Sequence, residues 1–327
     1  MTREKPLSER EIIQTMGGIL FPEGWAPDDV ASLQASGEGR LVCSTDSLVA
    51  STDVPSSMSL FDASRKAAVS VVSDFASKGV QVEGMLFSLS LPPAHTRKDI
   101  ENLARGLRAA SQQYGFTILA ADTNEARDLV VNCTGFGFTT RDIPGRGSAS
   151  PGDIVLTTGL FGLSPLGLHL AKRDLRPESE VEVRASDAFL SPTVKVESAL
   201  KLVATGHVTS SMDSSDGLLT SLYDIAEASD VKITMDGLPT YPGIEEAATK
   251  HGLDLQNLVL AGGEEYESIF TVSPAGWEEA QRLIQEGSSY YRIGEAGVGK
   301  GVYLRENSSL RPLRRRGWEH LRRRLSP

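Results

Sequence analysis

The sequence predicts an α/β protein of two domains, and three observations lead to that prediction. The chain has 327 residues, more than a single domain usually holds. Short apolar runs typical of strands alternate with segments of helical periodicity along the whole chain. A stretch rich in Gly, Ser and Pro from Arg141 to Gly152 separates two such halves. We therefore expect an N-terminal domain over 1–145 and a C-terminal domain over 146–327, each with strands covered by helices.

The first half predicts a helix over 8–20, a loop over 21–39, and then strands and helices in alternation. Strands are expected at 41–49, 84–91, 116–121 and 129–138, with helices over 60–79 and from Pro93 to about 114. Polar groups interrupt this pattern at Ser44-Thr45-Asp46 inside the first strand, at Asp74 near the apolar helix face, and at Asp122 after the third strand. Each could serve a ligand or could only stabilise local structure.

The second half begins with a strand over 153–158 and a glycine-containing turn into a helix. A helix over 193–205, a short strand over 207–211, a strand over 231–235 and a helix near 243–251 follow. An acidic loop, Gly262-Gly263-Glu264-Glu265-Tyr266-Glu267, then precedes a strand over 268–273, a helix over 276–286, and strands near 290–296 and 301–305. We predict an α/β sandwich for this half.

The turn that contains Asp213 and Asp216 is the centre of the functional prediction. It lies between a short strand and a helix that starts at Leu218, and Gly217 permits a tight backbone turn. Two carboxylates three residues apart on such a turn repel each other unless a cation lies between them, and the helix N-terminus favours a phosphate. The alternative is that an Asp or Ser here only caps the helix.

Composition limits the possible partners. The formal net charge is −10 and the pI is near 5.1, which argues against nucleic acid as the main partner. The Arg-rich stretch from 311 to 324 is expected to be a solvated tail, with nucleic-acid binding as the alternative. No segment is predicted to span a membrane, and Cys43 and Cys133 are expected to be buried thiols. A cytoplasmic protein is therefore expected.

The chemistry indicated by the remaining motifs is phosphate chemistry. The sequence has no phosphate-binding loop with Lys followed by Ser or Thr, no dinucleotide fingerprint, no protein-kinase motif set and no nucleophile elbow. Several aspartates do occur at strand and loop ends in both halves. Carboxylate oxygens suit Mg²⁺, which usually also binds phosphate oxygens.

Eight segments, in order, resemble motifs of the thiamine-monophosphate kinases, within the larger family that includes aminoimidazole-ribonucleotide synthetase. They are Pro27-Asp28-Asp29-Val30-Ala31, Ser44-Thr45-Asp46-Ser47-Leu48-Val49, Ser73-Asp74-Phe75-Ala76-Ser77-Lys78-Gly79, Ala120-Ala121-Asp122-Thr123, the stretch from Arg146 to Asp153, Asp213-Ser214-Ser215-Asp216-Gly217-Leu218, the acidic loop at 262–267, and Arg316-Gly317-Trp318-Glu319-His320.

The resemblance implies direct transfer of the ATP γ-phosphoryl group to thiamine monophosphate, assisted by several Mg²⁺ ions, in a homodimer whose first halves form a barrel. It implies that Asp122, Asp213 and Asp216 are catalytic. The implied metal ligands are Asp29, Ser44, Thr45, Asp46, Asp74, Asp122, Asp213 and Asp216. The implied ATP contacts are Ala121, Asp122, Arg146 and Ser215, and the implied contacts to thiamine monophosphate are Asp53, Glu264 and Trp318.

Two other functions are compatible with these residues. One is another ATP-dependent enzyme of the same superfamily that acts on a different substrate. The other is a nucleotide-binding protein without turnover, suggested by Ala120-Ala121 at the position where the family has two glycines.

Overall fold

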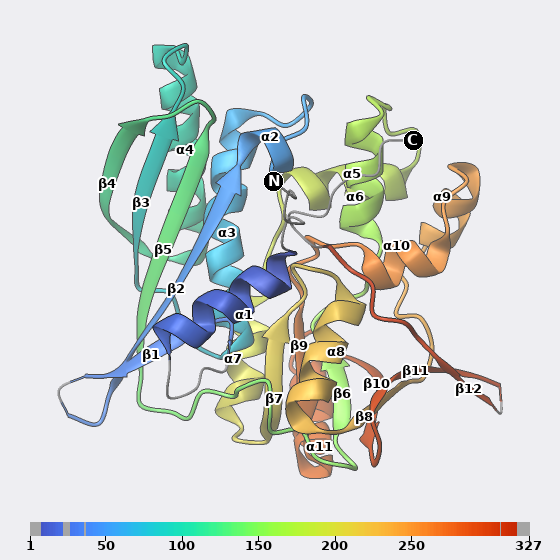
Figure 1. The fold of residues 1–327 in the computed structure, drawn as a ribbon. Coiled ribbons are helices and arrows are strands. Elements are labelled where there is room, and N and C mark those ends of the chain that lie inside the picture. The colour runs from blue at the N-terminus through green and yellow to red at the C-terminus, as the bar shows by residue number, and fades with distance from the viewer. Residues whose placement is uncertain (1–7, 22–26, 36, 308, 319–327) are drawn as a thin grey trace, which may run out of the picture.

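The computed structural model describes residues 8–21, 27–35, 37–307 and 309–318, and it arranges them around two mixed β-sheets (Figure 1). In the first sheet the order is β1 (Ala31–Gln34), β2 (Arg40–Val49), β5 (Val130–Thr139), β3 (Gly84–Leu91) and β4 (Thr117–Glu125). In the second sheet the order is β12 (Ser309–Pro312), β11 (Gly301–Glu306), β8 (Lys232–Met235), β10 (Tyr291–Gly297), β6 (Ile154–Thr157), β9 (Ser268–Val272) and β7 (Val208–Asp213).

Helices cover these sheets and join their strands. They are α1 (Glu9–Leu20), α2 (Ala50–Asp53), α3 (Leu60–Ser77), α4 (Arg97–Tyr114), α5 (Leu163–Lys172), α6 (Glu180–Leu190), α7 (Val196–Ala204), α8 (Leu218–Ser229), α9 (Ile244–Lys250), α10 (Leu255–Ala261) and α11 (Pro274–Gln285). The prediction of two α/β units is therefore confirmed. The first sheet is open within one chain, since β1 and β4 are its two edges.

Several elements differ from the sequence prediction. Strand β1 lies in the segment expected to be a loop, because it pairs antiparallel with β2. Strand β4 continues past Ala121 as far as Glu125, because it pairs in parallel with all of β3. Asp122 is thus within a strand and not after it. Helices α2, α6 and α10 and strand β12 were not predicted.

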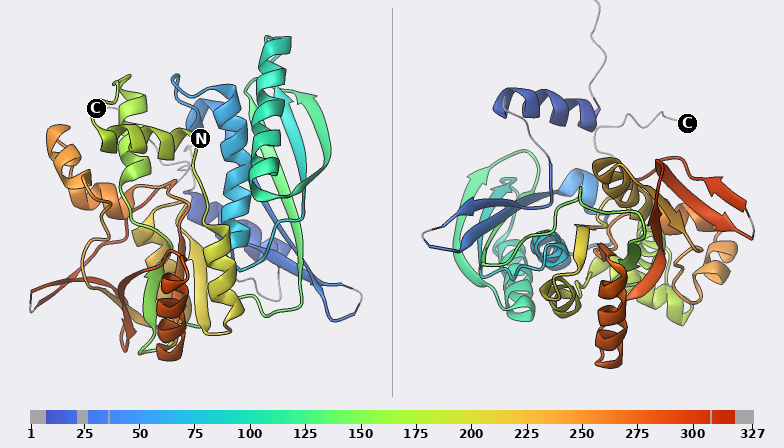
Figure 2. Two further views of the ribbon diagram at one scale, coloured as in Figure 1. Left: turned by 180° about the vertical axis from the view of Figure 1, so that it is seen from behind. Right: turned by 90° about the horizontal axis from the view of Figure 1, so that it is seen from below.

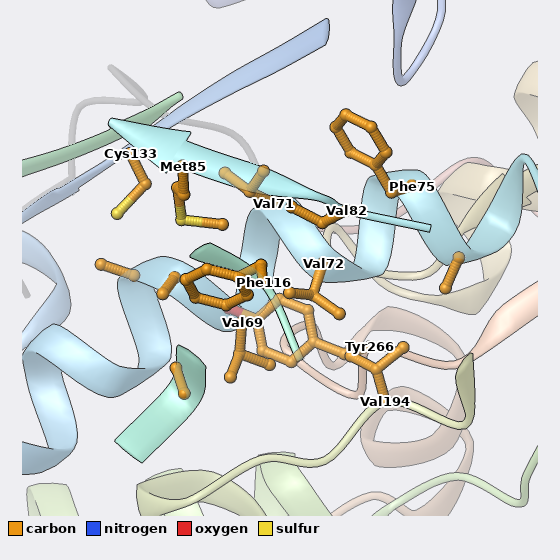
Figure 3. Packing of buried hydrophobic residues seen from close by; sticks show 14 of the residues in the cluster. Val69, Val71, Val72, Phe75, Val82, Met85, Phe116, Cys133, Val194 and Tyr266 are labelled. Atoms are coloured by element: carbon orange, nitrogen blue, oxygen red, sulfur yellow. The ribbon is translucent and has the colours of Figure 1, made fainter. Parts of the chain in front are cut away.

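Helix α3 lies between the two halves and is buried on nearly all sides (Figure 1). Figure 3 shows Val69, Val71, Val72 and Phe75 of this helix among side chains of both halves. The capping residue Ser59 accepts a hydrogen bond from the backbone N–H of Asp62 and so starts the helix. A helix enclosed in this way has to find partners for every polar group it carries.

The two faces of the first sheet are in different environments. One face packs against α3: a Cβ atom on Gly135 of β5 would lie 2.6 Å from Val71 Cγ1. The opposite face, here called the outer face, exposes apolar side chains that include Leu33, Leu86, Leu119 and Phe138. Helix α1 stands apart from both sheets (Figure 2) and exposes Ile13, Met16, Ile19 and Leu20.

The cysteines lie on neighbouring strands. Cys133 on β5 is buried, Cys43 on β2 is partly buried, and both are free thiols. Within the described ranges, no helix combines the length and the apolar character that crossing a bilayer requires.

Candidate active site

The site is built on a polar stripe of α3. Lys66, Ser70, Ser73 and Ser77 recur at spacings of four, three and four residues, so they share one face of the helix. All four are buried. Three of them contact acidic residues from other elements, and Ser70 lines a pocket beside them. The stripe therefore marks where the second half and the loop at 27–30 meet α3.

Four carboxylates converge beside this stripe, and we call Asp29, Asp46, Asp74 and Asp213 the acidic cluster. Burial raises the pKa of Asp74 well above its usual range, and the charges of Asp213, Asp29 and Asp46 raise it further. Burial, followed by the charge of Asp29, raises the pKa of Asp213 to about 7. The cluster brings acidic groups from both halves together, and these groups repel one another when they are ionised.

Hydroxyl groups orient two of these carboxylates. Ser44 Oγ of β2 donates a hydrogen bond to Asp74 Oδ2 over 2.5 Å. Ser73 Oγ donates to Asp213 Oδ2 over 2.8 Å, and Ser215 Oγ donates to Asp213 Oδ1 over 3.0 Å. The bond from Ser73 directly ties α3 to the strand–helix turn of the second half.

Asp29 is held by two cations. Lys78 Nζ lies 3.2 Å from Asp29 Oδ2 and 2.6 Å from Asp28 Oδ1, and Arg146 forms an ion pair with Asp29. Burial alone would raise the pKa of Asp29, but the charges of Lys78 and Arg146 outweigh burial and lower it. Arg146, predicted to contact ATP, is therefore paired with a predicted metal ligand in this structure.

The donor set of the acidic cluster suits a hard cation such as Mg²⁺. Buried carboxylates that repel one another are relieved when a cation lies between them. Among the described residues, no three acidic, His or Cys side chains already surround one point at metal-binding geometry. Mg²⁺ usually takes only one or two carboxylates and completes its coordination with water and substrate phosphates, so the residues fit such an ion.

A pocket of about 450 Å³, here called the central pocket, opens beside the acidic cluster. Its lining includes all three residues predicted to contact thiamine monophosphate: Asp53, Glu264 and Trp318. Asp46, Ser215 and Asp216 line the same pocket. The structure thus places the predicted acceptor contacts beside predicted phosphate and metal contacts.

Tight packing fixes Trp318 against the turn at Asp216. The backbone N–H of Trp318 donates to the Asp216 carbonyl oxygen over 3.0 Å. A Cβ atom on Gly317 would lie 1.9 Å from Thr220 Oγ1 and 2.6 Å from that same carbonyl oxygen, so only glycine fits here. The Lys172 ammonium lies 5.8 Å from the centre of the Trp318 ring. Glu319 and His320, the rest of this motif, lie outside the described residues.

The acidic loop at 262–267 presents Glu264 and Tyr266 in an uncommon conformation. Both have positive φ values, 63° and 52°, which cost energy for residues other than glycine. The intervening Glu265 accepts hydrogen bonds from the backbone N–H groups of Gly162 and Ser164 at the start of α5. Glu267 pairs with Lys195 Nζ over 2.6 Å. These anchors hold Glu264 at the central pocket.

Sequence reasoning did not identify Lys66 and Tyr266 as site residues, although both line the central pocket. The Lys66 side chain is only 2% exposed, lines the central pocket and forms an ion pair with Glu264. Its ammonium also lies 4.3 Å from the centre of the Phe189 ring. A lysine within the apolar pattern of 60–79 was the signal that could have identified it.

Three predicted site residues lie elsewhere in the chain's fold. Thr45 Oγ1 lies 3.0 Å from Thr134 Oγ1, on the face of β2 opposite Ser44 and Asp46. Ala121 and Asp122 lie on the exposed edge strand β4, and the register runs Ser47–Asn132–Ser88–Asp122 across the sheet. Three strand spacings, about 14 Å, therefore separate Ser47 on β2 from Asp122 on β4. One chain therefore does not bring Asp122 to the acidic cluster.

Comparison with known proteins gives a consistent assignment. The family model of the AIR synthase related protein N-terminal domain matches residues 27–139, and that of its C-terminal domain matches residues 150–307. The thiamine-monophosphate kinase of Nitrosopumilus maritimus is 35% identical over 320 residues, which is 97% of this chain and 99% of the relative. That of Pyrococcus abyssi is 33% identical over 296 residues, 90% of each chain.

A solved structure shares the fold. AaThiL complexed with AMPPCP and TMP aligns with a TM-score of 0.86 at 24% identity, covering 98% of this chain and 99% of that one.

Proposed function

The chain belongs to the thiamine-monophosphate kinases within the AIR synthase related family, and we propose that it transfers the γ-phosphoryl group of ATP directly to thiamine monophosphate, giving thiamine diphosphate and ADP. One observation carries the assignment of the site. The central pocket joins Asp53, Glu264 and Trp318 to Asp46 and Asp216 in a single cavity.

The reaction calls for neutralisation of charge more than for a catalytic base. The bond between the γ-phosphorus and the β,γ-bridging oxygen of ATP breaks, and a bond forms from that phosphorus to a phosphate oxygen of the acceptor. A phosphomonoester is largely a dianion at pH 7, so its oxygen needs no deprotonation. Two anions must instead be brought together and aligned.

The central pocket suits the organic part of thiamine monophosphate. Trp318 is 41% exposed, and its ring offers a face for a heteroaromatic ring. The thiazolium ring is a cation, and the carboxylates of Asp53 and Glu264 favour it. Ion pairing with Lys66 keeps Glu264 oriented toward the pocket. We assign these three residues, Asp53, Glu264 and Trp318, to the acceptor.

Residues around the acidic cluster are assigned to the phosphates and to Mg²⁺. Bound Mg²⁺ would neutralise the transferring phosphoryl group and the acceptor phosphate. Asp29, Ser44, Asp46, Asp74, Asp213 and Asp216 would hold the ions, and Ser215 and Arg146 would contact ATP. Arg146 can do so because its guanidinium already lies at this cluster, paired with Asp29.

We also propose a homodimer in which the outer face of the first sheet meets a second copy, and the two sheets close a barrel. The exposed apolar residues Leu33, Leu86, Leu119 and Phe138 support this proposal, since such a surface is typical of an interface. The dimer would give Thr45, Ala121 and Asp122 their roles, because they lie on the outer face or on its edge strand β4. We place the enzyme in the cytoplasm, where ATP and Mg²⁺ are available.

The test is a direct assay with purified protein, ATP, Mg²⁺ and thiamine monophosphate, with products separated by chromatography. We expect thiamine diphosphate and ADP in equal amounts from the wild type, and at least a hundredfold loss of rate in Asp216→Asn. Asp236→Asn is the matched control, because Asp236 is paired with Arg292 and Arg305 away from the central pocket.

The other outcomes would each contradict the proposal. ADP formed without thiamine diphosphate would indicate a different acceptor. ATP bound without any product would indicate a nucleotide-binding protein without turnover. For the dimer, Leu119→Asp should shift the mass measured by light scattering from two chains to one; an unchanged mass would remove the dimer proposal and, with it, the role of Asp122.

A further inference from the structure

A second pocket, of about 470 Å³, lies next to the central pocket and shares none of its described lining residues. Helix α10, Leu219 of α8 and the chain from Arg311 to Arg316 form its walls. In Figure 1 this last segment leaves β12 and runs back past α10 toward the centre of the molecule. We call it the arginine pocket.

The charge of the arginine pocket is opposite to that of its neighbour. Its lining carries three guanidinium groups, from Arg311, Arg314 and Arg316, against the single carboxylate of Asp254. That carboxylate accepts a hydrogen bond from the backbone N–H of Asn257 and caps α10. The central pocket carries five carboxylates against two ammonium groups. In a protein with a net charge of −10, this local excess of positive charge favours an anion.

The arginines of this segment differ in their partners. Arg315 binds Asp224 over 2.5 Å and Glu227 over 3.1 Å, and Arg311 binds Glu306 over 2.9 Å. Arg314 and Arg316 have no ion pair with any residue in the described part of the chain. Both residues line the pocket and are exposed, so their guanidinium groups are available to bind phosphate oxygens through paired N–H donors.

The remaining lining is mainly polar. Gln256 and Asn257 add hydrogen-bonding groups, whereas Leu219, Leu260 and Leu313 are almost fully buried and offer little apolar surface. The volume lies in the range of pockets that hold small organic ligands. We propose that the arginine pocket is a second binding site, for a small organic phosphate whose phosphate groups contact Arg314 and Arg316 and whose body meets the amide groups of Gln256 and Asn257.

The site is placed directly behind the wall of the central pocket. Leu219 is three residues after Asp216, Ala261 is three before Glu264, and Arg316 is two before Trp318. Thr220 Oγ1 donates to the Arg316 carbonyl oxygen over 3.2 Å, which joins α8 to the arginine segment. The two ligands would therefore lie on opposite sides of the same three chain segments.

The test is calorimetric titration of the full chain with ADP and, separately, with inorganic pyrophosphate, both in EDTA. Without divalent ions the acidic central pocket repels both anions, whereas the arginine pocket needs no metal. We expect one ADP per chain, bound at least tenfold more weakly by Arg314→Ala/Arg316→Ala. The double variant Arg282→Ala/Arg315→Ala removes the same charge from arginines that are paired elsewhere, and should stay within twofold of the wild type.

Four outcomes would overturn the proposal. These are absence of ADP binding by the wild type, an equal loss in the control variant, pyrophosphate binding as tightly as ADP, and stronger ADP binding in Glu264→Gln. The third would mean a site for the free anion only, and the fourth would place ADP in the central pocket. Because the titration measures binding without turnover, its failure leaves the proposed kinase reaction untouched.

Discussion

Glu265 is expected to make the stability of the protein depend on pH. Its carboxyl group is enclosed between the acidic loop at 262–267 and the start of α5, where it accepts backbone hydrogen bonds from Gly162 and Ser164. Burial raises the pKa of Glu265 from 4.5 to about 8, against the lowering effect of those two bonds. In the folded protein the group is therefore protonated at neutral pH, whereas in the unfolded chain it is ionised.

The sign and size of the effect follow from this difference. Because the folded state holds a proton that the unfolded state has lost, the free energy of unfolding falls as pH rises from 4.5 to about 8. At about 1.4 kcal/mol for each pKa unit, the upper limit is about 5 kcal/mol. The residue as a whole is only partly buried, so solvent screens part of this penalty, and we expect a loss of about 2–3 kcal/mol.

The perturbation is Glu265→Gln, which keeps the shape of the side chain and removes its titration. The assay is urea denaturation at pH 5, 7 and 9, followed by tryptophan fluorescence. Relative to wild type, the variant should gain about 2–3 kcal/mol between pH 5 and pH 9. Glu286→Gln, which removes an exposed carboxylate from the end of α11, is the control. Denaturation midpoints of Glu265→Gln and wild type that run parallel from pH 5 to pH 9 would refute the reasoning.

Three further predictions concern the site. Lys66→Met should raise KM for thiamine monophosphate more than it lowers kcat, because it leaves Glu264 unpaired at a cost of about 3 kcal/mol. Lys66→Arg should restore part of the affinity, and equal KM values in Lys66→Met and wild type would exclude the positioning role. Gly317→Ala should raise that KM about tenfold, since the added methyl group displaces Trp318 by overpacking worth about 1–3 kcal/mol, while Gly237→Ala, with open space around it, should not. Mg²⁺ at one hundred times its Kd should stabilise the wild type by about 2.7 kcal/mol over EDTA in thermal unfolding, and Asp213→Asn should lose most of that response; an equal response would remove Asp213 from the metal site.

Local patterns were enough to predict most elements of the fold. The strand over 84–91 was predicted at its observed bounds because glycine and Pro92 delimit an apolar run. The elements that were missed depend on distant partners. Strand β1 is short and exposed and exists through its pairing with β2, and β4 continues through polar residues only because β3 extends beside it. Such pairing cannot be recognised from the sequence of the paired segment alone.

The candidate site was predictable where a motif residue also lies on the sheet face that meets α3 or lines the central pocket. Asp46 and Ser44 alternate onto the face that meets α3, and Asp53, Glu264 and Trp318 line one pocket although far apart in sequence. Asp122 could not be placed from the chain alone, because strand order and register decide which residues meet across a sheet. Its register partner across the sheet, Ser47, faces the side opposite Asp46.

The polar stripe of α3 explains why the candidate site lies where the two halves meet. A helix in this position could have been apolar on all sides, and burying serines and a lysine there is unfavourable unless each finds a partner. The partners come from separate elements: Ser73 donates to Asp213, Ser77 donates to Asp29, and Lys66 pairs with Glu264. Each contact satisfies the helix by bringing a carboxylate toward it. Two of these carboxylates, Asp213 and Asp29, lie close enough to Asp74 that their charges raise its pKa. The same contacts that join the halves therefore gather the carboxylates that we propose as Mg²⁺ ligands, and binding of that ion would be thermodynamically linked to docking of the second half on α3.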